Sequence, residues 1–136
     1  MVRDIMHDTF FLQQKSIPAT PFDKPVAMDL LETLQAHADA CVGMAANMIG
    51  VAKCIIAVNV GPFYMVMFNP KIVKQKGPYQ TKEGCLSLSG ERETKRYREI
   101  EVEFEDMDFQ KKTMKFKAFP AQIIQHEVDH LQGILI

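Results

Sequence analysis

The sequence predicts an α+β fold in which antiparallel or mixed sheets pack around a C-terminal helix, with a further helix near the N-terminus. Apolar residues recur at helical spacing over residues 23–40 and again from Pro120 to Leu131. Between these segments, residues 53–76 and 98–118 carry the apolar runs and alternating patterns of strands. Because strands follow one another without β-α-β alternation, the fold class is α+β.

Composition limits the classes of function. The chain has 136 residues, 47% of them hydrophobic, and a net charge of −1 with both signs interspersed. This length suits one core, so residues 1–136 are expected to form a single domain. The chain has no cluster of basic residues that would indicate binding to nucleic acid or to an anionic membrane. No segment has transmembrane length. Three cysteines without a signal peptide predict a cytoplasmic protein with reduced thiols.

The first third of the chain contains one predicted helix. Residues 1–22 are weakly patterned, and Pro18 and Pro21 bracket a predicted loop. The helix spans residues 23–40, with Pro25 in its first turn. Its apolar face consists of Val26, Leu30 and Leu34. His37 lies near this face, where a position at the edge of the core is favoured over a role as a metal ligand.

Strands fill most of the middle of the chain. Residues 53–60 and 63–69 predict two strands around a Gly61-Pro62 turn, and a third short segment runs from Pro70 to Lys76. Residues 92–98 mix basic and acidic side chains, which favours a solvated face. Residues 98–105 and 113–118 alternate cleanly. The side chains expected to face inward are Ile100, Val102, Phe104, Met114 and Phe116.

The closing helix carries the pattern H-E-x-x-H. His126 and His130 are four residues apart, so both imidazoles project from one helix face and can bind one metal ion. Glu127 is close enough to move a proton of a water bound there. Two histidines at this spacing also occur on ordinary surfaces, but the intervening Glu and the apolar backing of the helix favour a metal site.

A third ligand must come from upstream, because only five residues follow Leu131 and none is a suitable ligand. Cys85 follows a glycine and precedes the turn-prone residues 87–90, which suits an accessible thiolate. Cys41 and Cys54 have more apolar neighbours, and Cys54 is interpreted as a packed core thiol. Cys85 is therefore the best candidate. The small residues of 41–50 fit either a plain connection or a cleft wall that a substrate backbone approaches.

Three stretches together resemble, in order, the three motifs of peptide deformylases. They are residues 43–50 (GMAANMIG), 83–87 (EGCLS) and 125–131 (QHEVDHL). The resemblance implies a metallohydrolase that removes the N-formyl group from the initiator methionine of nascent bacterial or organellar chains. It implies Cys85, His126 and His130 as metal ligands, Glu127 as general acid and base, and the Leu86 N–H as an oxyanion donor. The implied metal is Fe(II) in the cell, with Zn, Ni or Co able to substitute.

The resemblance also implies how a substrate is held. Residues 42–44 would pair with the substrate backbone as an added strand. The substrate-binding set is Val42, Gly43, Met44, Glu83, Gly84, Arg92, Phe119, Gln122, Ile123 and His126. Two roles remain open for Arg96 and Glu83. Either they form a pair that stabilises the loop carrying Cys85, or both side chains are solvated. The implied partners are formyl-methionyl peptides and nascent chains at the ribosome, with the protein itself a monomer.

One position departs from the family pattern. The first motif normally carries a glutamine whose amide stabilises the oxyanion, and Met48 stands there in this chain. Methionine donates no hydrogen bond, so slow catalysis is expected. Asn47 is expected to point away, unless a rearranged loop brings its amide in. The chain fits a short, divergent member without the family's C-terminal helix. A metal-dependent amidase for another N-acyl substrate and a non-catalytic metal or formyl-peptide binder remain as alternatives.

Overall fold

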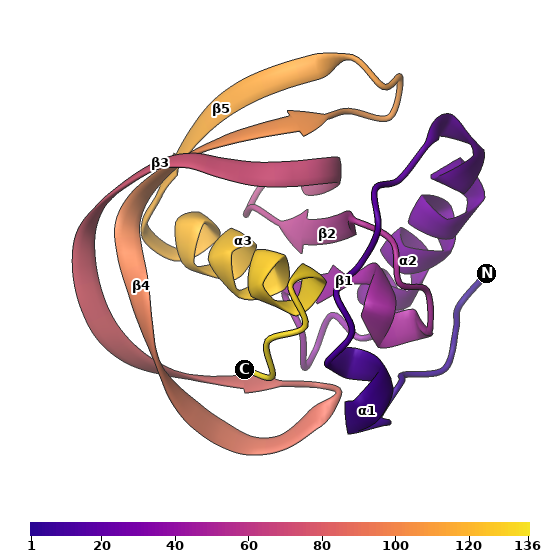
Figure 1. Ribbon diagram of the computed structural model, residues 1–136, viewed down its shortest axis with the longest axis horizontal. Helices are drawn as coiled ribbons and strands as arrows, with labels where there is room; N and C mark the ends of the chain where they lie inside the picture. The colour runs from indigo at the N-terminus through magenta and orange to yellow at the C-terminus, as the bar shows by residue number, and fades with distance from the viewer.

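The computed structural model describes residues 1–136 and confirms the α+β class. Its single sheet has five antiparallel strands in the order β1-β2-β3-β4-β5. Figure 1 shows the two long strands, β3 and β4, curving around helix α3, which lies inside the bend. The strands are β1 (Gly43–Ala45), β2 (Ile55–Asn59), β3 (Tyr64–Cys85), β4 (Leu88–Glu105) and β5 (Lys111–Lys117). The helices are α1 (Thr9–Leu12), η1 (Pro21–Asp23), α2 (Lys24–Ala36), η2 (Ala46–Ile49) and α3 (Ala118–Leu131).

The β3–β4 hairpin is longer than the sequence predicts. The expected separate strand from Pro70 is wrong, because β3 runs unbroken to Cys85. The turn expected at residues 87–90 is shorter and begins earlier, since β4 starts at Leu88. Pro70 falls at a register shift between Phe68 and Lys71, where a residue without an N–H breaks no ladder bond. The turn consists of residues 86–87 alone, so Cys85 lies opposite Leu88 at the closed end of the hairpin.

Helix α2 packs on β1 and β2 through its predicted apolar face. Leu30 and Leu34 are fully buried. The helix ends at Ala36, four residues earlier than predicted, and His37 is its C-terminal cap. The Nδ1 atom of His37 lies 2.9 Å from the carbonyl oxygen of Thr33, so this imidazole completes the helix end.

One cluster of 22 buried residues forms the core between α2, α3 and the sheet. In β4, Ile100, Val102 and Phe104 are buried as predicted. The inward prediction fails for Met114, which is 36% exposed. Its strand, β5, is the edge of the sheet and has only β4 beside it, so little chain is available to cover it. No helix in the structure has the length and apolarity needed to cross a membrane.

The N-terminal segment ties together the three stretches that carry the motifs. The Met6 N–H donates to the carbonyl oxygen of Met48 at 2.7 Å. The Nδ1 atom of His7 lies 3.0 Å from the carbonyl oxygen of Ser87. Farther along, the Ser16 N–H donates to Leu131 at the end of α3. This segment, which has almost no sequence pattern, therefore fixes the relative positions of η2, the hairpin turn and α3.

Candidate active site

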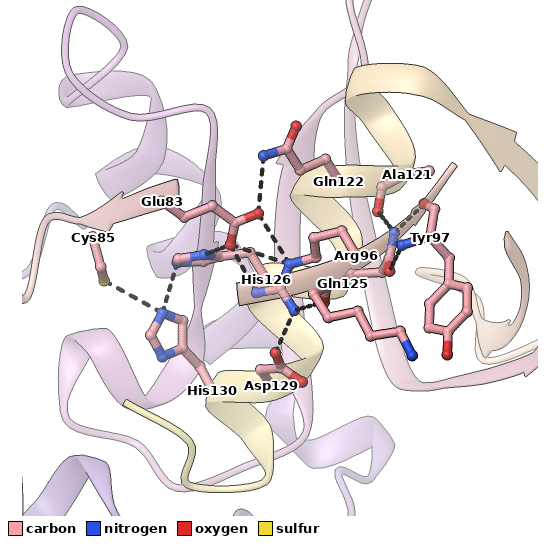
Figure 2. Close-up of polar contacts among 11 residues, drawn as sticks. Glu83, Cys85, Arg96, Tyr97, Ala121, Gln122, Gln125, His126, Asp129 and His130 are labelled. Atoms are coloured by element: carbon pink, nitrogen blue, oxygen red, sulfur yellow. Dashed lines mark hydrogen bonds and ion pairs between the residues drawn. The ribbon is translucent and has the colours of Figure 1, made fainter. Parts of the chain in front are cut away.

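Helix α3 and the end of β3 bring together three atoms that can bind a metal ion. His126 and His130 share one face of α3, with their Nε2 atoms 3.0 Å apart. The Sγ atom of Cys85 lies 3.3 Å from Nε2 of His130. The three atoms lie within 4.8 Å of one another, and Figure 2 shows them converging from the helix and the hairpin.

The chemistry of these atoms fits a divalent transition metal. A thiolate and two imidazoles form a donor set that iron, zinc, nickel and cobalt all accept. The Nδ1 atom of His126 is already occupied by Glu83, 2.7 Å away, which leaves Nε2 as the free nitrogen. A carboxylate on the far side of a ligand histidine is the usual means of fixing its ring. Three protein ligands also match the open coordination of catalytic metal sites.

A buried ion-pair network stands behind His126. Arg96 is 3% exposed and contacts Glu83 at 2.7 Å and Asp129 at 2.6 Å (Figure 2). The solvated-face interpretation of residues 92–98 is therefore wrong for Arg96, and the alternative, a pair between Arg96 and Glu83, is confirmed. Burial alone would raise the pKa of Glu83, but hydrogen bonds from His126, Arg96 and Gln122 lower it to about 2. Glu83 therefore stays ionised, and its hydrogen bonds link β3 to β4 and to α3.

Glutamine side chains connect the same three elements. The side chain of Gln125 accepts from the Tyr97 N–H and donates to the Tyr97 carbonyl oxygen, both at 2.8 Å. This paired contact fixes α3 against β4 at the residue directly before His126. The amide of Gln122 donates to Glu83 at 2.9 Å, so it holds the second carboxylate oxygen (Figure 2).

Glu127 lies beside the ligand atoms in a nearly closed position. Its carboxylate is almost fully buried, and its Oε1 atom has no hydrogen-bond partner within the protein. Burial raises the pKa of Glu127 to about 7. A Cβ atom on Gly43 would lie 2.9 Å from Oε2 of Glu127, so only a glycine gives the carboxylate this much room. An unpartnered buried carboxylate oxygen is suited to a proton-carrying ligand.

The two histidines differ in charge in the metal-free protein. Burial alone would lower the pKa of His126, but its contacts with Cys85 and Glu83 raise it to about 10. Burial and the positive charge of His126 lower the pKa of His130 to about 3. Two imidazolium groups cannot coexist at 3.0 Å, so one ring is charged and the other neutral.

A cavity of about 230 Å³ opens over these groups. It is lined by every residue assigned to the site from the sequence except Met44, Arg92 and His130. Met44 is fully buried in the core, and His130 lies beneath His126 with 1% exposure. The guanidinium of Arg92 instead donates to the carbonyl oxygen of Ser89.

Three residues at the cavity were missed in the sequence, namely Ala40, Cys41 and Lys82. Cys41 precedes the first motif, and Lys82 precedes the second, so adjacency to a motif was the available signal. The Cys41 thiol donates to the carbonyl oxygen of Gly43 at 2.8 Å. Burial raises the pKa of Cys41 to about 12, so this thiol keeps its proton.

The first motif shows how Met48 and Asn47 are used. Met48 lines the cavity, and its Sδ atom accepts from the Ala45 N–H at 3.4 Å. Asn47 points the other way, and its amide donates to the carbonyl oxygen of His130 at 2.9 Å. Gly50 ends η2 with a φ of +83°, a conformation that favours glycine. The amide of Asn47 therefore braces the end of α3 and does not face the cavity.

Known proteins match both the sequence and the fold. Residues 3–136 match the family model for polypeptide deformylase. A peptide deformylase from Clostridium beijerinckii is 52% identical over 136 residues, which is the full length of both chains. The peptide deformylase structure from Thermotoga maritima superposes with a TM-score of 0.90 at 26% identity, covering 99% of this chain and 95% of that one.

A structure with a bound peptide is also similar. The class I type b peptide deformylase from Acinetobacter baumannii, solved with Met-Ala-Ser bound, has a TM-score of 0.89 and 26% identity. The alignment covers 99% of this chain and 97% of that one. The full-length match to the family and the cysteine–histidine–histidine centre lead to one conclusion. This chain belongs to the polypeptide deformylase family and is a metal-dependent hydrolase that removes the N-formyl group from nascent polypeptides.

Proposed function

We propose that Cys85, His126 and His130 bind the catalytic metal ion, with Fe(II) the metal in the cell and Zn, Ni or Co able to replace it. The observation that carries this proposal is the convergence of the three ligand atoms within 4.8 Å, beside a buried carboxylate. When bound, such an ion supplies Lewis-acid chemistry, which activates water and polarises a carbonyl group. Glu83 would hold the His126 ring through the 2.7 Å contact at Nδ1.

Glu127 is proposed as the general acid and base. Its Oε1 atom has no partner within the protein and is free to take a proton from the attacking water. A pKa raised to about 7 suits a group that accepts this proton and later gives it to the leaving amine. Gly43 leaves the carboxylate little room to move, since a Cβ atom at that position would meet both Glu127 and Ile123.

The formyl-methionyl peptide is proposed to lie between two free strand edges. Gly43 is on β1, an edge strand, and Gly84 lies where β3 pairs only with β4. Both line the cavity, so an extended peptide can add there as a strand. The similar A. baumannii protein, solved with Met-Ala-Ser bound, supports a peptide ligand of this kind. The methionine side chain would contact Val42, Phe119, Gln122, Ile123 and His126.

Oxyanion stabilisation is proposed to depend on the Leu86 N–H. Leu86 lines the cavity directly after Cys85, at the closed end of the hairpin. Met48 occupies the cavity wall with a sulfur atom that already accepts a hydrogen bond. A thioether donates nothing, so the developing negative charge has one protein donor fewer than a glutamine would provide.

The setting of the enzyme follows from the same features. We propose that residues 1–136 form a single domain, because 22 core residues form one continuous cluster. We also propose a monomer that works in the cytoplasm on nascent chains at the ribosome. The net charge of −1 and the three free cysteines are consistent with that compartment and with no direct binding to nucleic acid.

Formate release tests the proposed function directly. Metal-free protein is loaded anaerobically with Fe(II), or separately with Ni(II), and given formyl-Met-Ala-Ser. Formate should appear with metal and not without it. An anomalous-scattering map should place the metal at Cys85, His126 and His130. Turnover of other N-acyl peptides without turnover of the formyl peptide would instead identify an amidase of different specificity. A metal found away from Cys85 would refute the ligand set.

A further inference from the structure

Strand β1 has one edge without a strand partner, and this edge faces the cavity. The Asn59 N–H donates to the Val42 carbonyl oxygen at 2.8 Å, so these two residues form a hydrogen-bonded pair. In an antiparallel ladder such pairs alternate with non-bonded ones, and Gly43 opposite Val58 is the next pair. The N–H and C=O of Gly43 therefore point away from β2. Because β2 is the only neighbour of β1, they point to the free edge.

A side chain of the protein already occupies the acceptor on that edge. The Cys41 thiol donates to the Gly43 carbonyl oxygen at 2.8 Å, and both residues line the cavity. The next N–H on this edge, that of Ala45, donates to Met48 Sδ at 3.4 Å. Two sulfur-containing side chains thus satisfy backbone groups that an added strand would use. Gly43 also lies beside Glu127, so its carbonyl oxygen is a hydrogen-bond acceptor close to the proposed base.

We propose that Cys41 limits the affinity for peptide substrates, because its thiol competes with the peptide backbone for the Gly43 carbonyl oxygen. The proposal rests on the proposed addition of the peptide along β1. It assigns Cys41 a positioning role, with no part in the chemistry. The cost of displacement is the loss of one hydrogen bond and a half-buried S–H left without an acceptor. A bond of this kind is worth about two- to tenfold in affinity.

Removal of the thiol should therefore improve binding. With formyl-Met-Ala-Ser, the Cys41→Ala variant should lower KM by about two- to tenfold while kcat changes less than about twofold. Cys41→Ser keeps a donor at the same place, so its KM should stay at or above that of the unaltered protein. Cys54→Ala is the matched control, because its half-buried thiol lies at the Ser16 carbonyl oxygen, away from the cavity. An unchanged or higher KM in Cys41→Ala would overturn the proposal.

Infrared spectroscopy adds a readout that needs no turnover. In zinc-loaded Cys54→Ala protein, Cys85 is held as a thiolate by the metal, so Cys41 carries the only S–H group. Adding the product peptide Met-Ala-Ser should move its S–H stretching band to higher frequency, as the bond to Gly43 breaks. A band that does not move, or a peptide that does not bind, contradicts the proposal. If the band moves but no formate is released in the kinetic assay, the proposed function fails and the role of Cys41 stands.

Discussion

The Nδ1 atom of His126 lies 2.7 Å from Oε1 of Glu83, and this contact joins helix α3 to β3, the strand that ends at Cys85. The same carboxylate is held by Arg96, so the ring of His126 is oriented by a charged group that cannot rotate freely. Such carboxylate–histidine contacts typically contribute 10- to 100-fold to metal affinity.

The Glu83→Gln variant tests this contribution. It preserves the shape of the side chain but removes the charge, so metal affinity should fall by about 10- to 100-fold. A chelator-competition titration with Zn(II) measures the change, with the melting temperature of the metal-free protein followed in parallel. Glu93→Gln is the control, because the Glu93 side chain is exposed on β4 and has no hydrogen bond or ion pair to His126, His130 or Cys85. Equal affinities for the two variants would show that Glu83 does not orient the ligand.

Metal binding should release the proton of His126. In the metal-free protein the pKa of His126 is raised to about 10, so the ring is charged at pH 8. A metal ion needs the neutral imidazole, hence affinity should rise with pH until pH reaches about 10. Calorimetry at pH 8 in buffers of different ionisation enthalpy counts the protons released. The count should be lower, by up to about one, in Glu83→Gln, which removes a cause of the raised pKa. Identical counts would contradict the assignment.

The sequence predicts the ligand-bearing helix well because its signal is local. Two histidines and a glutamate within five residues need only one helical turn to converge, and α3 provides it. The alternation of Ile100, Val102 and Phe104 is local in the same sense, and these residues are buried as expected. Local patterns thus predicted helix α3 with both histidines on one face, the core face of β4 and the α+β class.

Long-range packing explains what the sequence did not predict. Arg96 looks like a surface residue in a charged run, and only the curvature of β3 and β4 around α3 buries it between Glu83 and Asp129. The Cys41 thiol bonds only two residues along the chain, to the Gly43 carbonyl oxygen, but that oxygen is left free because of how β1 pairs with the distant strand β2. Asn47 points away from the cavity as expected, but its partner, the His130 carbonyl oxygen near the end of α3, is distant in sequence and was not predicted. None of these contacts leaves a periodic signal in the chain.

Restoring a donor at position 48 should speed catalysis. In Met48→Gln, the side-chain oxygen can accept from the Ala45 N–H as the sulfur does now, which leaves the amide N–H groups for the oxyanion. An oxyanion donor is typically worth about 10²- to 10³-fold in kcat, which sets the upper limit of the gain. Met48→Leu matches the apolar bulk without a donor and should stay near the unaltered rate. Formate release with Ni(II) measures all three proteins, and equal rates for them would refute an oxyanion role at this position.

Removing the proposed base should separate chemistry from metal binding. Glu127→Gln keeps the size of the side chain in its buried position but cannot accept a proton. The value of kcat should fall by about 10²- to 10⁴-fold, while the metal content stays at that of the unaltered protein. Formate release and elemental analysis of the same preparation provide the two values. A rate within twofold of the unaltered enzyme would eliminate Glu127 as the base.

The position of the Glu127 carboxylate should depend on the missing side chain of Gly43. A Cβ atom there would lie 2.6 Å from Ile123 Cγ2 and 2.9 Å from Glu127 Oε2, closer than real Cβ contacts allow. In Gly43→Ala the carboxylate must move away from β1, and misplacing a catalytic group by about 1 Å costs roughly 10²-fold in kcat. Metal content should not change, because none of the three ligand residues is among the groups the Cβ would meet. Combining Gly43→Ala with Ile123→Ala removes one of the two close contacts and should restore part of the rate. If Gly43→Ala alone kept full kcat, the close approach of β1 to Glu127 would have no role in placing the base.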